Sequence, residues 1–410
     1  MSMKEAIAAK ETKNQFMKYS ADKRNQALNA MAKALKENIS LIEEENQKDI
    51  QLAKKENLSM AMIDRLLLNK ERINSLCQSV RDIANQEEVV GQITEKKTRP
   101  DGLIIQKQRI PIGVIAMIFE SRPNVVVDCS ALAIKSGNCI ILKGGKEAAY
   151  SNSVLTKIIR ESISAFIPIN VVQSISTRDD VSELLNQVGF IDVIIPRGGE
   201  GLINYVTSNS KVPVLAHYKG LCHIFIDKSA DPLMAKEITI NAKASRAGVC
   251  NATETLLIHN DFPKDSIKEI ILDLKKHGTE IRVDEKLHKS YPDLILATDI
   301  DWATEYLDNI LSIKMVNTLD EAINHIQKYG SNHTEAIISS DQESIELFQN
   351  TVDASSIMVN ASTRFNDGGE YGLGAELGIS TSKLHAYGPM GAAQMTTQRF
   401  LVYGSGHTRK

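Results

Sequence analysis

The chain has 410 residues, more than one domain usually holds, so we expect two domains with separate cores. Hydrophobic residues make up 42% of the chain and charged residues 24%, which excludes wholesale disorder. The 48 basic and 51 acidic side chains are interleaved, and this pattern argues against nucleic acid as a partner.

The amino-terminal residues carry charges throughout and contain no apolar stretch as long as a signal peptide or membrane span. We therefore expect a cytoplasmic protein that does not associate with membranes. From about Glu5 to Asn85, apolar residues recur with the period of an α-helix, which predicts a helical block. Pro100-Asp-Gly102 then offers turn chemistry between strand-like residues 89–94 and 103–110, which predicts a projecting β-hairpin.

Beyond the hairpin, short apolar strands alternate with helices. The first series has expected strands at 113–119, 139–142, 171–174 and 193–195, with helices at 125–135, 147–164 and near 180–187. The second has expected helices at 232–243, 266–276 and 319–328, with strands at 255–258, 313–316, 336–339 and 356–359. Such alternation is typical of parallel sheets buried on both faces, so we predict an α/β protein with two parallel-sheet domains.

Five cysteines are scattered along the chain, and none forms a CxxC pair. A lone cysteine is most often a small buried hydrophobe, and the apolar neighbours of Cys129, Cys139 and Cys222 fit that interpretation. Cys250 instead lies between a predicted helix and a predicted strand, among small residues that would let a substrate approach its sulfur. The nine histidines show no metal-ligand spacing, so we expect a metal-independent protein.

Several sequence blocks resemble the aldehyde dehydrogenase superfamily. The runs 110–124 and 136–146 resemble its cofactor-binding start. More specific blocks resemble the gamma-glutamyl phosphate reductase family within it, over essentially the whole chain: Glu120-Ser-Arg-Pro-Asn-Val125, Pro196-Arg-Gly-Gly-Glu-Gly201, and the runs 217–223, 242–254 and 361–370. This resemblance favours Cys250 as a nucleophile.

The resemblance also implies a division of the chain into parts. It places an NADPH-binding domain at residues 1–97 and 111–228, and a catalytic domain at 229–360. The hairpin 98–110 and the tail 380–410 would form a small oligomerisation element, and 361–379 would return the chain to the cofactor domain. A homo-oligomer is therefore expected.

The activity implied is reduction of L-glutamyl 5-phosphate by NADPH through a thioacyl intermediate on Cys250. The products would be phosphate and L-glutamate 5-semialdehyde, in the second step of proline biosynthesis. A complex with glutamate 5-kinase, which makes the unstable substrate, is a further partner to consider. Two rivals stay open: an aldehyde dehydrogenase that oxidises a small aldehyde to the free acid, and a non-catalytic protein that kept the fold.

Cofactor roles follow from the same resemblance. Lys143 stands where aldehyde dehydrogenases keep a lysine that binds the adenosine ribose, although a solvated strand-end lysine fits as well. Lys146 replaces a glutamate of NAD-preferring relatives, and a lysine there attracts the 2′-phosphate of NADPH. The turn Arg197-Gly198-Gly199 comes directly before a predicted helix, whose first N–H groups could bind a phosphate or the nicotinamide. An ordinary turn between a strand and a helix is the alternative interpretation. Glu305 aligns with a glutamate that holds the nicotinamide ribose, or is simply exposed.

Roles toward the substrate are less sharply divided. Ser121 aligns with an asparagine that helps to bind the oxyanion, although backbone N–H groups near Cys250 could do most of that work. Arg122, Arg246 and Arg364 are candidates for binding the acyl phosphate and the substrate carboxylate, because guanidinium groups match both anions. Each arginine could instead belong to a structural ion pair.

Two departures from the superfamily pattern carry information. Hydrolytic members place a glutamate base where this chain reads Leu215-Ala-His-Tyr-Lys-Gly220, without an acid. Because that base activates water, its absence predicts that phosphate is the acyl acceptor. In the tail, Tyr387 stands where relatives usually carry arginine, which weakens any anion-binding role at that position.

Overall fold

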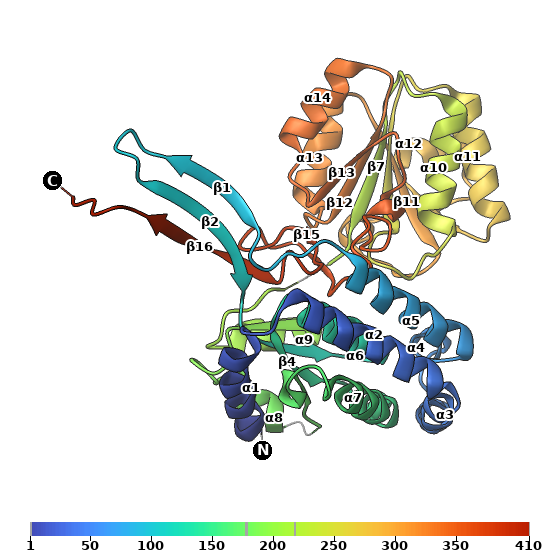
Figure 1. Ribbon diagram of the computed structural model, residues 1–410. Coiled ribbons are helices and arrows are strands. Elements are labelled where there is room, and N and C mark those ends of the chain that lie inside the picture. The colour runs from blue at the N-terminus through green and yellow to red at the C-terminus, as the bar shows by residue number, and fades with distance from the viewer. Residues whose placement is uncertain (1, 177–178, 217–218, 410) are drawn as a thin grey trace. The chain divides into compact units, whose positions relative to one another are not determined.

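The computed structural model of the chain describes residues 2–176, 179–216 and 219–409. It divides into two compact units (Figure 1). The first comprises Met1–His217, Gly372–Gly378 and Leu384–Lys410, and the second comprises Tyr218–Tyr371 and Ile379–Lys383. Each unit contains a parallel sheet, so the prediction of an α/β protein with two parallel-sheet domains is confirmed. Within the described ranges, no helix combines the length and the apolar character needed to cross a bilayer.

The predicted amino-terminal helical block is confirmed. It comprises α1 (Ser2–Phe16), α2 (Ala21–Glu37), α3 (Ile39–Lys55), α4 (Met60–Leu66) and α5 (Lys70–Asn85). Side chains cap the starts of three of these helices: Ser20, Ser59 and Asn69 accept hydrogen bonds from the N–H groups of Lys23, Met62 and Arg72, respectively. Such caps satisfy N–H groups that have no partner inside the helix.

A three-stranded antiparallel sheet follows, with β2 (Ile104–Pro111) between β1 (Ile93–Thr98) and β16 (Thr396–Tyr403). The predicted hairpin is present, and Gly102 adopts a φ of +87° in its turn. Its first strand begins at Ile93, four residues later than expected, because the residues just before it form a turn with Gly91 at φ +89°. The tail 380–410 was expected to join the hairpin in one element, but the strand β16 within it was not predicted.

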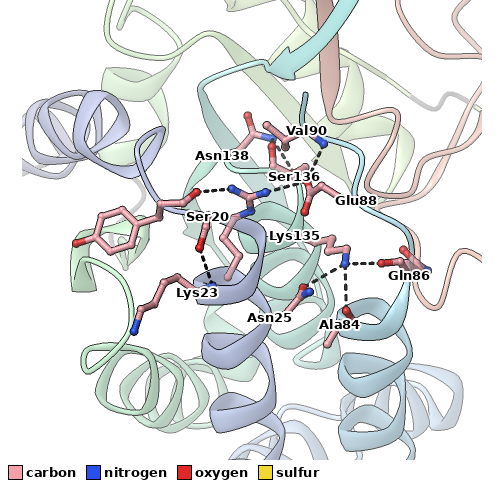
Figure 2. Close-up of polar contacts among 12 residues, drawn as sticks. Ser20, Lys23, Asn25, Ala84, Gln86, Glu88, Val90, Lys135, Ser136 and Asn138 are labelled. Atoms are coloured by element: carbon pink, nitrogen blue, oxygen red, sulfur yellow. Dashed lines mark hydrogen bonds and ion pairs between the residues drawn. The ribbon is translucent and has the colours of Figure 1, made fainter. Parts of the chain in front are cut away.

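Two buried cations fix the segment between α5 and the hairpin (Figure 2). Lys135 is fully buried, and its Nζ donates to Asn25 Oδ1 at 3.1 Å, Ala84 O at 3.1 Å and Gln86 O at 2.7 Å. An ammonium group has three donors, and all three find acceptors. Arg24 Nη2 lies 2.8 Å from the carboxylate of Glu88. The first residues of the segment are therefore held in place where the chain leaves α5.

The parallel sheet of the first unit has the order β5-β4-β3-β6. Its strands are β3 (Val114–Phe119), β4 (Cys139–Lys143), β5 (Val172–Ser174) and β6 (Val193–Arg197). The connecting helices are α6 (Asn124–Lys135), η1 (Lys146–Ala148), α7 (Ala149–Ile163), η2 (Ile169–Val171), α8 (Asp179–Leu184) and α9 (Glu200–Asn209). The chain runs outward from β3 to β5 and then returns to the other side of β3, which creates a topological switch point between β3 and β6.

The second unit holds a seven-stranded parallel sheet of order β10-β9-β11-β8-β7-β12-β13. Its strands are β7 (Cys222–Ile226), β8 (Thr253–His259), β9 (Glu280–Val283), β10 (Ile295–Leu296), β11 (Ile310–Val316), β12 (Thr334–Ile338) and β13 (Ser356–Val359). Figure 1 shows α13 (Leu319–Tyr329) and α14 (Gln342–Thr351) on one face of this sheet. The other face carries α10 (Pro232–Ala244), α11 (Lys264–Lys276) and α12 (Glu285–Ser290).

The division between units differs from the expected bounds. We expected the first domain to extend to residue 228, but β7 pairs with β8 and β12 and therefore lies in the sheet of the second unit. The expected return segment 361–379 is also divided, because residues 361–371 belong to the second unit and 372–378 to the first. The short elements η3 (Asp301–Ala303), η4 (Thr363–Phe365), β14 (Ile379–Ser380) and β15 (Gly388–Pro389) complete the fold.

Candidate active site

The carboxyl edge of the four-stranded sheet gathers most of the expected cofactor residues. Lys143 ends β4 and Arg197 ends β6, on the two sides of β3, where they pair with Ile118 and Phe119. Ligands of open parallel sheets bind at this edge, at the point where the strand order reverses. The structure therefore brings Lys143 and the turn after Arg197 to the same switch point.

The turn after β6 is packed against Glu120. Gly199 is the N-cap of α9, and its N–H donates to Glu120 Oε2 at 2.9 Å. A Cβ on Gly198 would lie 2.3 Å from the same oxygen, so a larger residue there would require the Glu120 side chain to move. Arg197 Nη2 lies 3.8 Å from Glu376. The N–H group that we expected to meet a phosphate thus already has a carboxylate acceptor.

Lys143 and Lys146 have different surroundings. Lys143 is half-buried, and its Nζ donates to the carbonyl of Gly144 at 2.9 Å. The side chain of Lys146 is 84% exposed, and its Nζ lies 3.8 Å from the carboxylate of Glu56. Lys146 is therefore accessible to an anionic ligand, with one acidic side chain close by.

Ser121 has a strained backbone, with φ at +44°. Few residues other than glycine adopt such values, and those that do often lie at functional sites. Ser121 is buried and bonded to Glu147, a residue that the sequence analysis did not single out. Arg122 follows in the same loop and is half-buried.

Cys250 lies in the second unit, in the loop between α10 and β8 at the amino-terminal edge of the sheet. It is half-buried, whereas the other four cysteines are buried. The backbone of Gly220 packs directly against it, because a Cβ on Gly220 would lie 2.6 Å from the Cβ of Cys250. Within the described part of the chain, the N–H groups of Cys250 and Asn251 make no hydrogen bond. They are available to an oxyanion beside the sulfur.

Two of the three candidate arginines lie in the same unit as Cys250. Arg364 belongs to η4; its Nη1 donates to Asn251 Oδ1, and Asn251 Nδ2 donates to the carbonyl of Asn366 at 2.9 Å. Burial, and then the charge of Arg246, lower the pKa of Arg364. Arg364 Nε is buried and has no hydrogen-bond partner among the described residues. Arg246 is exposed, so this pair combines one fixed and one accessible guanidinium.

Glu305 lies in the second unit too, half-buried between η3 and β11. Two residues later, the N–H of Leu307 donates to Glu254 Oε1 at 3.2 Å. Glu254 is the second residue of β8, which follows the Cys250 loop. The segment that carries Glu305 is thereby attached to the strand that follows the nucleophile.

The expected site residues therefore form two groups. Ser121, Arg122, Lys143, Lys146 and the turn 197–199 belong to the first unit, and Cys250, Arg246, Arg364 and Glu305 to the second. His217 and Tyr218, in the run without an acid, lie outside the described residues. No group of three or more histidine, cysteine, aspartate or glutamate side chains in the described ranges is arranged to hold a metal ion.

Comparison with known proteins fits this arrangement. The model of the aldehyde dehydrogenase family matches residues 2–291. The chain belongs to the aldehyde dehydrogenase family.

Within that family, the chain is similar to several proteins named gamma-glutamyl phosphate reductase. A gamma-glutamyl phosphate reductase of Geotalea daltonii is 47% identical over 390 residues, which cover 94% of this chain and 93% of the relative. One of Dictyoglomus thermophilum is 45% identical over 405 residues, 98% of each chain. The crystal structure of the gamma-glutamyl phosphate reductase of Thermotoga maritima superimposes with a TM-score of 0.96, at 41% identity and full coverage of both chains.

Proposed function

We propose that this chain reduces L-glutamyl 5-phosphate with NADPH to L-glutamate 5-semialdehyde and phosphate, the second step of proline biosynthesis. The observation that carries the proposal is the loop of Cys250, where a half-buried thiol lies in the same unit as Arg246 and Arg364. An acyl phosphate with a carboxylate at its far end presents two anions, and two guanidinium groups match them. The names of the similar proteins support this assignment.

The proposed reaction begins with attack of the Cys250 thiolate on the acyl carbon. The oxyanion that forms accepts hydrogen bonds from the N–H groups of Cys250 and Asn251, which have no other partner among the described residues. The bond between the acyl carbon and the phosphate oxygen then breaks, phosphate leaves with the bonding electrons, and a thioester remains on Cys250. Gly220 packs against the backbone and the Cβ of Cys250, where a larger residue would not fit.

Arg364 is suited to bind the anion that lies deeper in the site. Its Nη1 donates a hydrogen bond to Asn251, which holds the guanidinium in place. Its buried Nε has no hydrogen-bond acceptor among the described residues, and an oxygen of the bound anion would supply one. Arg246 is exposed and can bind an anion that enters from solvent. Arg122 remains a candidate from the first unit.

The residues at the carboxyl edge of the four-stranded sheet in the first unit suit the binding of a nicotinamide nucleotide. Lys143 lies at the switch point where such ligands bind, and the exposed ammonium of Lys146 suits a 2′-phosphate. The turn Arg197-Gly198-Gly199 is assigned to the phosphates or the nicotinamide, for which the Gly199 N–H would have to leave Glu120. Glu305 is assigned to the nicotinamide ribose. When bound, the cofactor supplies the hydride that reduces the thioester. Collapse of the resulting thiohemiacetal frees the Cys250 thiolate and the aldehyde.

The parts of the chain receive roles on the same basis. The first unit binds the cofactor, the second carries the nucleophile, and the sheet of β1, β2 and β16 joins copies of the chain into a homo-oligomer. The exposed side chains of Phe400, Val402 and Tyr403 on β16 support an association surface. We place the protein in the cytoplasm and consider a complex with glutamate 5-kinase, the enzyme that supplies its substrate.

The reverse reaction tests the proposal. Pyrroline-5-carboxylate is the cyclic form of the aldehyde product, and we expect it to sustain the reduction of NADP only when inorganic phosphate is present. The acyl phosphate formed would be trapped by hydroxylamine as a hydroxamate. Sustained turnover to free glutamate in phosphate-free buffer would instead identify the rival, a hydrolytic aldehyde dehydrogenase. Cofactor binding without turnover in either buffer would identify a non-catalytic protein.

A further inference from the structure

Lys243 and Glu254 form a fully buried ion pair around the nucleophile loop. Lys243 is the penultimate residue of α10 and Glu254 the second residue of β8, and both side chains are 0% exposed. Their Nζ and Oε2 atoms lie 2.7 Å apart. Cys250 lies between them in sequence, so the pair ties together the two ends of the loop that carries the sulfur.

The same carboxylate reaches a third segment. Glu254 Oε1 accepts the hydrogen bond from the N–H of Leu307, and Leu307 adopts an unusual φ of +51°. The two oxygens of Glu254 thus connect the end of α10 to the segment that carries Glu305. A single buried side chain relates the nucleophile to a residue assigned to the nicotinamide ribose.

Stability alone does not account for such a pair. Removing two charges from water costs free energy that their attraction often fails to recover, and apolar side chains of similar volume frequently replace buried ion pairs without loss. Burial raises the pKa of Glu254 to about 7 and lowers the pKa of Lys243, which shows the cost of keeping both groups charged. A geometric requirement explains the pair better than a gain in stability.

We infer that Lys243 and Glu254 are positioning residues, which hold the Cys250 loop and the Glu305 segment in the relative geometry that the reaction needs. This inference rests on the proposed roles of Cys250 and Glu305. Both side chains are fully buried, so we expect neither positioning residue to touch substrate or cofactor. Their effect should therefore appear in kcat and in the reactivity of the Cys250 thiol, rather than in the affinity for NADPH.

Single substitutions leave one buried charge without its partner and so test folding rather than positioning. Two double variants avoid this difficulty. In K243M/E254Q the ion pair is replaced by neutral groups, while the glutamine oxygen can still accept from Leu307. In K243M/E254L both connections are removed. K236M is the matched control, because Lys236 lies on the same helix and forms an ion pair with the exposed Glu269, at 3.2 Å.

We expect K243M/E254L to fold and to bind NADPH as the wild type does, with kcat lowered by about ten- to a hundredfold, the range that a displacement near 1 Å produces. K243M/E254Q should lose less, and K236M should lose nothing. The rate of Cys250 alkylation by iodoacetamide, followed by mass spectrometry without substrate or cofactor, should change in K243M/E254L. The four other cysteines are buried and serve as internal references.

A folded K243M/E254L variant with kcat within about twofold of wild type and an unchanged alkylation rate would overturn the inference. The alkylation rate separates this failure from failure of the proposed function. If the wild type showed no phosphate-dependent reductase activity, the proposed function would fall, whereas a changed alkylation rate would still show that the pair positions the thiol.

Discussion

The hydroxyl of Ser121 donates to Glu147 Oε1 at 2.8 Å, and the backbone N–H of Ser121 donates to the same oxygen at 2.6 Å. Both donors of this residue are thus directed at one carboxylate. A hydroxyl held in this way is not free to stabilise an oxyanion, which leaves that task to backbone N–H groups near Cys250.

Replacement of Ser121 by alanine should therefore lower kcat by less than about tenfold, far below the 10²- to 10³-fold loss typical of a removed oxyanion donor. Steady-state kinetics with Ser121→Ala give the answer. Glu147→Gln is the companion variant, because it weakens the bond that occupies the hydroxyl. A loss near 10³-fold in Ser121→Ala would show that the hydroxyl leaves Glu147 during the reaction.

Cys250→Ser should abolish reduction and leave NADPH binding intact. Among the described residues, no histidine or acidic side chain bonds to the Cys250 sulfur, so a serine hydroxyl would have no adjacent base and would be a poor nucleophile. Turnover and cofactor titration by fluorescence measure the two properties separately. Cys77→Ser is the matched control, since that thiol is also buried but lies in the first unit. Turnover of Cys250→Ser within tenfold of wild type would assign the chemistry to another residue.

Lys146→Glu should narrow or reverse a preference for NADPH over NADH, because repulsion of the 2′-phosphate replaces attraction. The carboxylate of Glu56, 3.8 Å from Lys146 Nζ, gives an opposite test. Glu56→Gln removes a negative charge from the same place and should raise the NADPH preference, by less than about tenfold because both side chains are exposed. The measurement is kcat/KM with NADPH and with NADH for each variant. Equal values of kcat/KM for the two cofactors in the wild type would remove the basis of both expectations.

The absence of an acidic residue in the run 215–220 predicts a pre-steady-state burst of NADPH in the oxidative direction. With pyrroline-5-carboxylate and NADP in phosphate-free buffer, one equivalent of NADPH per active site should form rapidly and turnover should then stop, because no base activates water to release the acyl group. Stopped-flow absorbance measures the burst, and added phosphate or arsenate should restore steady turnover. A linear time course without phosphate would show that another group activates water.

His325 should make the protein sensitive to mild acid. It is buried on α13 against His223 and Trp302, and burial, followed by the charges of His223 and Lys314, lowers its pKa to about 2. In the unfolded chain His325 binds a proton as the pH falls through about 6.5, whereas in the folded chain it stays neutral at that pH. The stability contributed by neutral His325 is therefore present above pH 6.5 and is lost as the pH falls, by about 1.4 kcal/mol per pH unit.

Urea unfolding at pH 7.5 and pH 5.5 measures this loss. His325→Phe keeps a ring in the same place and should show a smaller decrease in unfolding free energy between the two pH values. His277→Phe, at an exposed position, is the control and should behave as the wild type. An equal pH dependence in His325→Phe and the wild type would mean that this histidine does not determine the acid sensitivity.

Much of the fold could be predicted because its strands are continuous apolar runs. The strand β3 was predicted to within one residue, since six buried side chains follow one another. The strands β9 and β10 were missed because four and two residues are too short to show a period. The helix α14 was missed although Asp341 caps it by accepting from Ser344, which is a readable signal.

The site divides in the same way. Cys250 could be predicted as the nucleophile because the small residues around it and the family resemblance both indicate that role. The partners of the other residues could not be selected, because they are distant in sequence: Glu120 and Gly199 are 79 residues apart, and Ser121 and Glu147 are 26 apart. Pairs of this kind depend on which strands are neighbours, and single-sequence patterns do not report strand order.

The sheet of β1, β2 and β16 has two edges of unlike character. One edge, β1, carries Glu95, Lys96 and Lys97, charges that oppose pairing with another strand. The other, β16, presents exposed Phe400, Val402 and Tyr403. If two copies associate along β16 around a twofold axis, each covers the other's apolar edge. The charged β1 edges, which then lie outermost, would disfavour the addition of a third copy. The association proposed for β16 would therefore end at two copies and would not lead to fibre growth.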